Sequence, residues 1–328
     1  MFEAIRANLN AVRRFDHVIR SKSLEYGEVE TPSGAKALAV QVDGKVMTFE
    51  ENGVSQLVRQ WAIPPDHFQR LPRDLQVAEL SHFGMRDDKM LTLRTVENGD
   101  GNKIRATLSG RYSPFDSHDY LEAVEPVLSG WEISRDTYNR DELTLIVTKP
   151  QEFDVSTRKV GDIVKIGLTL RNNELGQGSA SVDFSLWRLM CLNGAQMATS
   201  EVSVRQRHMY FNRQTFAGVM RNAVQNAASI GMGMVESLRA SHTLALPNLD
   251  PDEGKLQKAV LKVLRENQAW GKEVQSYVKD QLGTKEEASL FGLVQIITGP
   301  WAKSASNLTT RNDRERVGGA LLELARAA

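Results

Sequence analysis

Cysteine is almost absent from the 328 residues of this chain, in which Cys191 is the only one. A lone cysteine excludes an intramolecular disulfide and a thiolate metal cluster built within one chain. Its neighbours Leu189, Met190 and Leu192 are apolar, which favours a small buried hydrophobic side chain over a nucleophile. Cysteine chemistry is therefore not expected here.

Long apolar runs are missing too. No stretch approaches the roughly 18–20 consecutive apolar residues that span a bilayer, and the longest apolar-leaning run, around Phe291 to Trp301, is interrupted by Gln295 and Thr298. Charged residues break up the first twenty positions, where a signal peptide would need an apolar segment. We expect a protein that is not exported and not inserted in a membrane.

The common catalytic signatures are absent as well. The six histidines form no His-x-x-x-His pair, and the chain has no Cys-x-x-Cys, no phosphate-binding loop, no dinucleotide fingerprint and no Gly-x-Ser-x-Gly elbow. Asp116, His118 and Asp119 could form an acid–base group, but a helix-capping aspartate is the favoured interpretation. We predict no metal ligands, no cofactor and no catalytic residues, and we favour a protein that is not an enzyme.

Net charge is zero, with 41 basic and 41 acidic residues. This balance argues against a strong nonspecific binder of DNA or membranes, whose field would be visibly positive. The charges are unevenly distributed, because residues 1–150 carry 19 basic and 23 acidic residues and residues 151–328 carry 22 and 18. A local basic surface is therefore compatible with a neutral total.

Hydrophobic periodicity predicts an α+β protein, in which a hairpin-rich antiparallel sheet flanked by helices is followed by a helical C-terminal region. Helical spacing over residues 2–20 indicates an amphipathic helix, and prolines divide residues 53–84 into short helices. Asp43-Gly44 fits the tight turn of a first hairpin. Further elements are expected at these ranges: a second hairpin at 90–96 and 103–109, a helix at 117–128, strands at 130–137, 142–148, 163–171, 179–190 and 198–206, and helices at 214–241, 253–270, 272–282, 285–298 and 308–327.

Two parts follow from this pattern. We predict a sheet domain with an N-terminal helix over residues 1–212 and a helical region over residues 213–328. Asn193-Gly194 is expected to form a tight turn after a strand, and Gly299-Pro300 is expected to end a helix.

One stretch, from Arg188 to Arg221, combines arginines with aromatic residues. Guanidinium groups pair with phosphate oxygens and aromatic faces stack on exposed bases, so a single-strand binder needs both. The alternative is that the arginines lie on a solvated face and that the aromatic residues belong to the core. A weaker candidate of the same kind is Lys103, Arg105 and Arg111 with Tyr112. The predicted nucleic-acid-binding residues are Arg111, Arg188, Arg205, Arg207, His208, Tyr210, Arg213 and Arg221.

Several segments resemble the phage/plasmid-like protein family, a domain of unknown function carried by phages and plasmids. The strand–loop–strand segment 170–179, the run 186–194 with its Arg-x-x-Cys-x-Asn-Gly, and the pair Arg207-His208 are similar to the family's motifs. Segment 110–116 resembles the family's Arg-Tyr turn before a helix, 307–309 and 317–322 are looser matches, and the resemblance spans about 35–325. It implies a mobile-element setting in a bacterial or archaeal cytoplasm, and it implies no activity.

Three hypotheses of function remain open. The first is an accessory protein of phage or plasmid nucleic-acid processing, in its most concrete form a single-stranded DNA-binding or annealing protein that acts in recombination as a homo-oligomer. The second is a protein-interaction module, such as an inhibitor of host defence or a replication scaffold, with an exposed apolar patch on the helices after Gln214. The third is an enzyme whose site gathers distant residues, for example Arg111, Glu174, Arg188 and His208.

Overall fold

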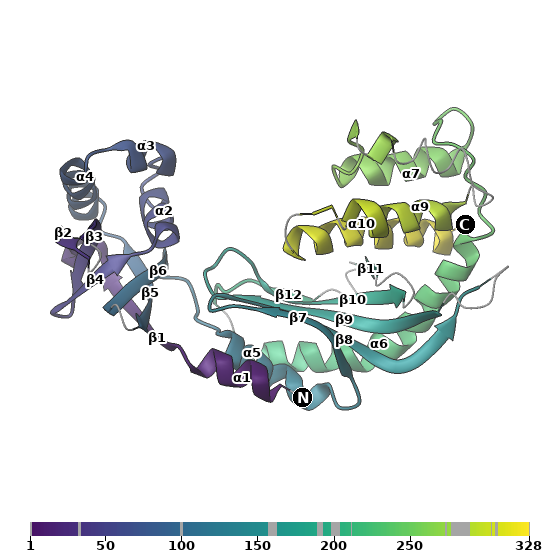
Figure 1. Cartoon of the computed structure of the whole chain (residues 1–328), viewed down its shortest axis with the longest axis horizontal. Helices are drawn as coiled ribbons and strands as arrows, with labels where there is room; N and C mark the ends of the chain where they lie inside the picture. The colour runs from purple at the N-terminus through teal and green to yellow at the C-terminus, as the bar shows by residue number, and fades with distance from the viewer. Residues whose placement is uncertain are drawn as a thin grey trace.

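The computed structural model has the predicted α+β fold, with two antiparallel-rich sheets and a helical C-terminal region (Figure 1). It describes the whole chain except residues 1, 32–33, 99–100, 157–162, 189–192, 198–203, 211, 273, 277–288, 303, 306–307 and 328.

The first sheet has six strands in the order β1-β5-β6-β4-β3-β2, and all neighbours are antiparallel except the parallel pair β4 and β6. Its strands are β1 (Arg13–Arg20), β2 (Glu25–Glu30), β3 (Lys36–Val42), β4 (Lys45–Phe49), β5 (Met90–Asn98) and β6 (Gly101–Ser109). Its helices are α2 (Glu51–Arg59), α3 (Pro65–Arg70) and α4 (Arg73–Arg86). The three helices begin and end around the prolines, as predicted.

Both predicted hairpins are confirmed. Asp43 and Gly44 join β3 to β4 with φ values of 50° and 77°, and this left-handed pair is the backbone that an Asp-Gly turn provides. β5 and β6 form the second hairpin, whose tip at residues 99–100 lies outside the described part.

The predicted helix over residues 2–20 is wrong in its second half. Helix α1 (Glu3–Asn10) is followed by β1, which pairs with β5 along its whole length, from Arg13 opposite Glu97 to Arg20 opposite Met90. The apolar residues of this segment are spaced for a helix, but aromatic and β-branched residues also suit a strand. Pairing with β5 decides the outcome, because it satisfies the backbone groups of residues 13–20 that face β5.

The second sheet is antiparallel, in the order β11-β10-β9-β8-β7, with β12 also paired to β10. Its strands are β7 (Glu132–Tyr138), β8 (Glu142–Asp154), β9 (Ile163–Asn173), β10 (Ala180–Arg188), β11 (Asn193–Met197) and β12 (Val204–Gln206). Asn193 and Gly194 thus lie in a strand, opposite Arg188 and Trp187. The predicted turn at Asn193-Gly194 is wrong, because the connection between the two strands is made by residues 189–192, which are not described.

The two faces of the second sheet differ in chemistry. Alternate residues of β8, β9 and β10, such as Leu145, Leu168 and Phe184, form an apolar face, while Thr169 and Asp183 lie on the other. Helices lie on both sides of the sheet (Figure 1): α5 (Ser117–Val124) and α6 (Arg213–Ser241) on one, and α9 (Leu290–Ile296) and α10 (Leu308–Ala327), with α7 (Lys255–Glu266) outside them, on the other.

Close packing holds α6 against the apolar face. A Cβ atom on Gly231 would lie 2.3 Å from the Cδ1 of Ile166, so only glycine allows this approach. On the opposite side, Gly299 and Pro300 lie inside the π-helical turn η3 (Ile297–Trp301) instead of ending a helix. The predicted stop is wrong, because the wider π turn accommodates a proline that would break an α-helical hydrogen bond.

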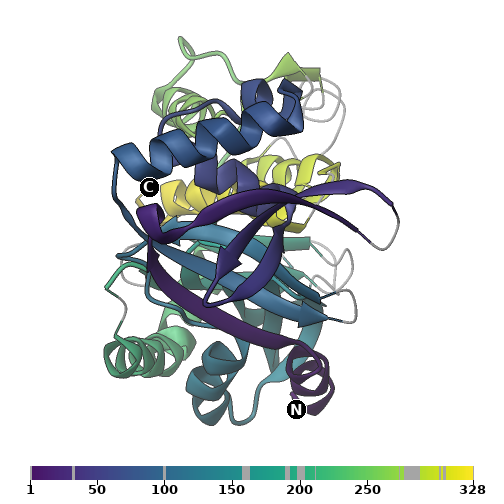
Figure 2. The same cartoon turned by 90° about the vertical axis from the view of Figure 1, so that its left-hand side faces the viewer.

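The hydrophobic cores divide the chain differently from the predicted boundary at residue 212. One core lies between the first sheet and α2–α4. The other contains α1, the second sheet and the C-terminal helices together, from Phe2 to Ala325. Seen from the end of the long axis, the first sheet stands in front of the second, with α1 below (Figure 2). The chain crosses between the cores at the α1–β1 and β6–α5 connections.

Among the described helices, none is both long and apolar enough to cross a membrane.

Candidate functional site

Two segments that are far apart in the sequence cross at the junction of the two sheets. Tyr112 forms an isolated antiparallel bridge with Met209, and the Ser113 backbone N–H donates to the carbonyl of His208 at 2.7 Å. This crossing joins the two basic segments that the sequence marked separately, the one around Arg111 and the one from Arg205 to Tyr210.

The outer side of the crossing is exposed and basic. Arg111 and Arg207 are exposed, and neither has an ion pair within the described part of the chain. On the same segment as Arg207, Met209 is 40% exposed and Tyr210 is 73% exposed. Tyr210 has a φ of 53°, a left-handed conformation that is uncommon for a non-glycine residue. We call Arg111, Arg207, Met209 and Tyr210 the crossing surface.

Helix α6 begins directly after the crossing surface. The Asn212 side chain caps it by accepting the N–H of Thr215 at 3.0 Å. A helix N-terminus carries a partial positive charge that attracts anions. The start of this long helix therefore adds to the positive potential of Arg111 and Arg207.

The inner side of the crossing is buried and holds no exposed cation. His208 is buried and stacks on Tyr112, with ring centroids 5.5 Å apart and an interplanar angle of 14°. Burial, and next the charge of Arg94, lower the pKa of His208 from 6.5 to about 4. The imidazole is therefore neutral at pH 7, and its position does not favour the phosphate contact predicted for it.

Arg94 lies behind this aromatic stack and is fully buried. It donates to Asp16 at 2.7 Å and to the Glu174 carbonyl at 2.6 Å, and it pairs with Asp116. Burial alone would lower the pKa of Arg94, but Asp116 and its other polar neighbours outweigh this and raise it. In return, Arg94 holds the pKa of Asp116 below its usual value although burial raises it.

Glu174 and Arg105 complete this buried network. Both side chains are fully buried, and Arg105 Nη1 lies 2.8 Å from Glu174 Oε2 and 3.0 Å from Asp141 Oδ1. Arg14 donates to the same Glu174 oxygen at 3.0 Å. The network joins β1, β5 and β6 of the first sheet to α5 and the loop after β9. Arg105, which the sequence suggested as a weaker nucleic-acid contact, is therefore an internal ion-pair partner.

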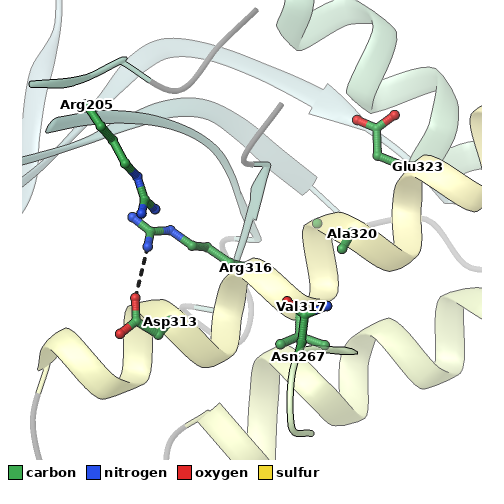
Figure 3. A pocket seen from close by; sticks show the side chains of 8 residues that line it. Arg205, Asn267, Asp313, Arg316, Val317, Ala320 and Glu323 are labelled. Atoms are coloured by element: carbon green, nitrogen blue, oxygen red, sulfur yellow. Dashed lines mark hydrogen bonds and ion pairs between the residues drawn. The ribbon is translucent and has the colours of Figure 1, made fainter. Parts of the chain in front are cut away.

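A second cluster of arginines, Arg171, Arg205 and Arg316, lies on the polar face of the second sheet. Figure 3 shows two of them, Arg205 and Arg316. In the strand register, Ser181 of β10 pairs with Arg171 of β9 on one side and with Arg205 of β12 on the other. The fully buried Asp183 lies two residues along β10; its Oδ1 is 3.8 Å from Arg205 Nη2, and its Oδ2 pairs with Arg316 of α10. Asp313 joins the cluster, 2.9 Å from Arg316 and 3.7 Å from Arg171.

The remaining predicted residues are not brought together with the crossing surface. The side chains of Arg188, at the end of β10, and of Arg213, at the start of α6, lie outside the described part. Arg221 is exposed two turns into α6. Arg205, half-exposed, points into the second arginine cluster. No sequence pattern pointed to Arg316, whereas Arg171 and Asp183 were readable only as charged residues on the polar side of alternating strands.

Helix α5 begins with the capping arrangement expected from Asp116. The Asp119 carboxylate accepts the backbone N–H of Asp116 at 3.2 Å as part of a capping box. The favoured interpretation of these aspartates is confirmed. His118, Asp119 and Glu122 also each bring a potential ligand atom within 4.8 Å of the others on this helix, but the capping role accounts for Asp119.

The two rival hypotheses expected other features. On α6, Val219 and Met232 are the large apolar side chains among the described residues that are exposed, at 41% and 42%. They are thirteen residues apart, about 20 Å along the helix, and form no patch. The cleft expected of an enzyme is not formed by Arg111, Glu174 and His208 either, since Glu174 and His208 are buried inside the junction while Arg111 faces outward.

Fold and site together describe an α+β protein with an exposed basic, aromatic surface where its two sheets meet. No protein-family model, no curated protein and no solved structure matches the chain. The resemblance to the phage/plasmid-like family stays a prediction.

Proposed function

We propose that the protein binds single-stranded DNA through the crossing surface. The observation that carries this proposal is the pairing of Tyr112 with Met209, because it brings the segment of Arg111 alongside the segment that carries Arg207 and Tyr210. Arginine beside an exposed aromatic ring is the combination that sequence-independent single-strand binding requires.

Each side chain of the crossing surface has a distinct role in this proposal. The ring of Tyr210 stacks on a base, a contact worth about 1–3 kcal/mol in comparable proteins. Arg111 and Arg207 pair with phosphates through charge-assisted hydrogen bonds. Met209 supplies a flexible apolar contact beside the ring. Duplex DNA offers its base faces only at its ends, so the protein prefers single strands.

The proposed role is that of a phage or plasmid accessory protein in DNA annealing or recombination, acting as a homo-oligomer in a bacterial or archaeal cytoplasm. Such a role needs no catalytic group, because bound cations lower the electrostatic cost of bringing two strands together and release counterions. It is supported by the surface chemistry and by the sequence resemblance alone.

The test compares three proteins for binding of a fluorescent oligothymidylate, measured by anisotropy at about 50 mM salt. The triple variant Arg111→Gln, Arg207→Gln, Tyr210→Ala removes the surface, and the double variant Arg59→Gln, Arg70→Gln removes two exposed arginines from the first sheet's helices. We expect strong loss of affinity in the triple variant and little change in the double variant. Absence of binding by the wild type, or an equal loss in both variants, contradicts the proposal. Oligouridylate and a duplex of equal length serve as competitors.

A further inference from the structure

The second arginine cluster borders a pocket between the second sheet and helix α10. The pocket has a volume of about 550 Å³, within the range of small-molecule sites. It is lined by Arg205, Asn267, Asp313, Arg316, Val317, Gly319, Ala320 and Glu323. Figure 3 shows the guanidinium groups of Arg205 and Arg316 gathered at one end and Glu323 at the other.

The basic end has more positive than negative charge. Three guanidinium groups, those of Arg171, Arg205 and Arg316, contact two carboxylates there, those of Asp183 and Asp313. Within the described part, Arg171 Nε and Nη2 and Arg316 Nε are buried without a hydrogen-bond partner. Burial, and next the neighbouring Arg316, lower the pKa of Arg171. These atoms are closed to solvent, whereas the half-exposed Arg205 opens on the pocket and can contact an anion there.

The other end has the opposite character. Glu323 lies seven residues after Arg316 on α10, about 10 Å along the helix and on the same side. Glu323 is partly exposed and lines the pocket there. An ionised carboxylate only accepts hydrogen bonds, so this end suits a donor. Val317, Gly319 and Ala320 provide an apolar wall between the two ends.

We infer that this pocket binds a small phosphate ester whose far end carries an amino group, the chemistry of a mononucleotide with an amino-substituted base. The phosphate lies at Arg205 and Arg316, the base lies along Val317 and Ala320, and the amino group donates to Glu323. Asn267, which lines the same wall, can both donate to and accept from the ligand.

This site is independent of the proposed strand-binding surface. Arg205 is two residues before Arg207, but its guanidinium group lies at Asp183 and lines the pocket. Arg207 has no ion pair in the described part and does not line this pocket. The two arginines therefore give a matched pair of variants from one short segment.

The test is isothermal titration calorimetry of the full chain with AMP, IMP and inorganic phosphate. IMP carries an oxygen where AMP carries the amino group, and this oxygen would face the Glu323 carboxylate. We expect AMP to bind more tightly than IMP and phosphate, and Arg205→Gln to weaken binding of AMP about ten- to hundredfold. The control Arg207→Gln should leave AMP binding unchanged. Glu323→Gln should remove the preference for AMP over IMP.

Two results would overturn the inference. One is that none of the three probes binds the wild-type protein at millimolar concentration. The other is that AMP binds but is indifferent to both Arg205→Gln and Glu323→Gln, which would place it elsewhere. Loss of oligonucleotide binding with AMP binding retained bears only on the crossing surface, so the two proposals fail separately.

Discussion

Arginine and tyrosine lie on both sides of the segment crossing at Tyr112, but they have different roles on the buried inner side and the exposed outer side. Inside, Arg94 and Arg105 are fully buried, and carboxylates from β1, from the start of α5 and from the loops before β8 and after β9 contact them. Outside, Arg111 and Arg207 have no carboxylate partner in the described part of the chain, and Tyr210, on the same segment as Arg207, is exposed. Arginine content alone therefore does not mark a binding surface. The burial of the guanidinium group and the presence of an acidic partner decide its role.

The inner side should respond most strongly when one partner of a buried pair is removed. Arg105→Ala leaves Glu174 and Asp141 without the guanidinium group that contacts both. We expect a loss of about 3–5 kcal/mol in the free energy of unfolding, measured by urea denaturation. The matched outer change, Arg111→Ala, should cost less than about 0.5 kcal/mol, because the residue is exposed. Equal losses of unfolding free energy in the two variants would show that the buried arginine is no more important for stability than the exposed one.

The buried histidine predicts a pH dependence that belongs to the inner side. The folded-state pKa of His208, about 4, lies below its ordinary value of 6.5. The unfolded chain therefore binds the proton more readily, and stability present above pH 6.5 is lost as the pH falls from 6.5 toward 4. The loss should reach at most about 3 kcal/mol.

Urea denaturation of the wild type and of His208→Gln across this pH range isolates the contribution of His208. Burial raises the pKa values of Asp116 and Asp141, but their arginine partners outweigh it and lower them. These two carboxylates therefore lose their contribution to the free energy of unfolding at lower pH. Parallel stability curves for the two proteins between pH 6.5 and 4 would show that His208 is not the group responsible.

The outer side should affect binding and leave stability unchanged. Tyr210→Ala should weaken oligonucleotide binding by about 1–3 kcal/mol, because it removes a stacking ring. The exposed Tyr210 adds little to the core, so the urea midpoint should stay within error of the wild type. Tyr210→Phe keeps the ring and should bind nearly as well. If Tyr210→Phe were as weak as Tyr210→Ala, stacking would not be the contribution of this residue.

The smallest effect is expected at the start of α5, where the inner network meets a helix cap. Asp119→Ala removes the carboxylate that accepts the Asp116 N–H, which should cost about 0.5–1 kcal/mol of stability. His118→Ala, at the next position on the same helix turn, is the control. Oligonucleotide binding should be unaffected in both, and a binding defect in Asp119→Ala would extend the site toward α5.

Local features of the fold could be predicted from the sequence where local chemistry decided them. The Asp43-Gly44 hairpin, the proline-bounded helices and the alternating strands β9 and β10 formed as expected. Residues 13–20 could not be assigned in this way, because their backbone pairs with residues of β5 that lie 70 to 84 positions later, from Arg20 opposite Met90 to Arg13 opposite Glu97. The helix stop predicted at Gly299-Pro300 was wrong for a related reason, since tertiary packing stabilises a π turn that local rules do not anticipate.

The site was predictable in part for the same reasons. Arg111, Arg207 and Tyr210 were all named from their residue types, but the two segments were seen as separate candidates. Their meeting depends on the bridge between Tyr112 and Met209, a contact between residues about a hundred positions apart. The burial of His208 and the role of Arg105 as an ion-pair partner depend on the junction of two sheets, which no local pattern reveals.

The salt dependence of DNA binding reports how many phosphates Arg111 and Arg207 neutralise. The affinity for an oligothymidylate is measured against salt concentration for the wild type and for the double variant Arg111→Gln, Arg207→Gln. If each arginine neutralises one phosphate, the slope of log affinity against log salt should fall by about 0.7 per residue, or about 1.4 in total. An unchanged slope, or no binding by the wild type at about 50 mM salt, would contradict the account.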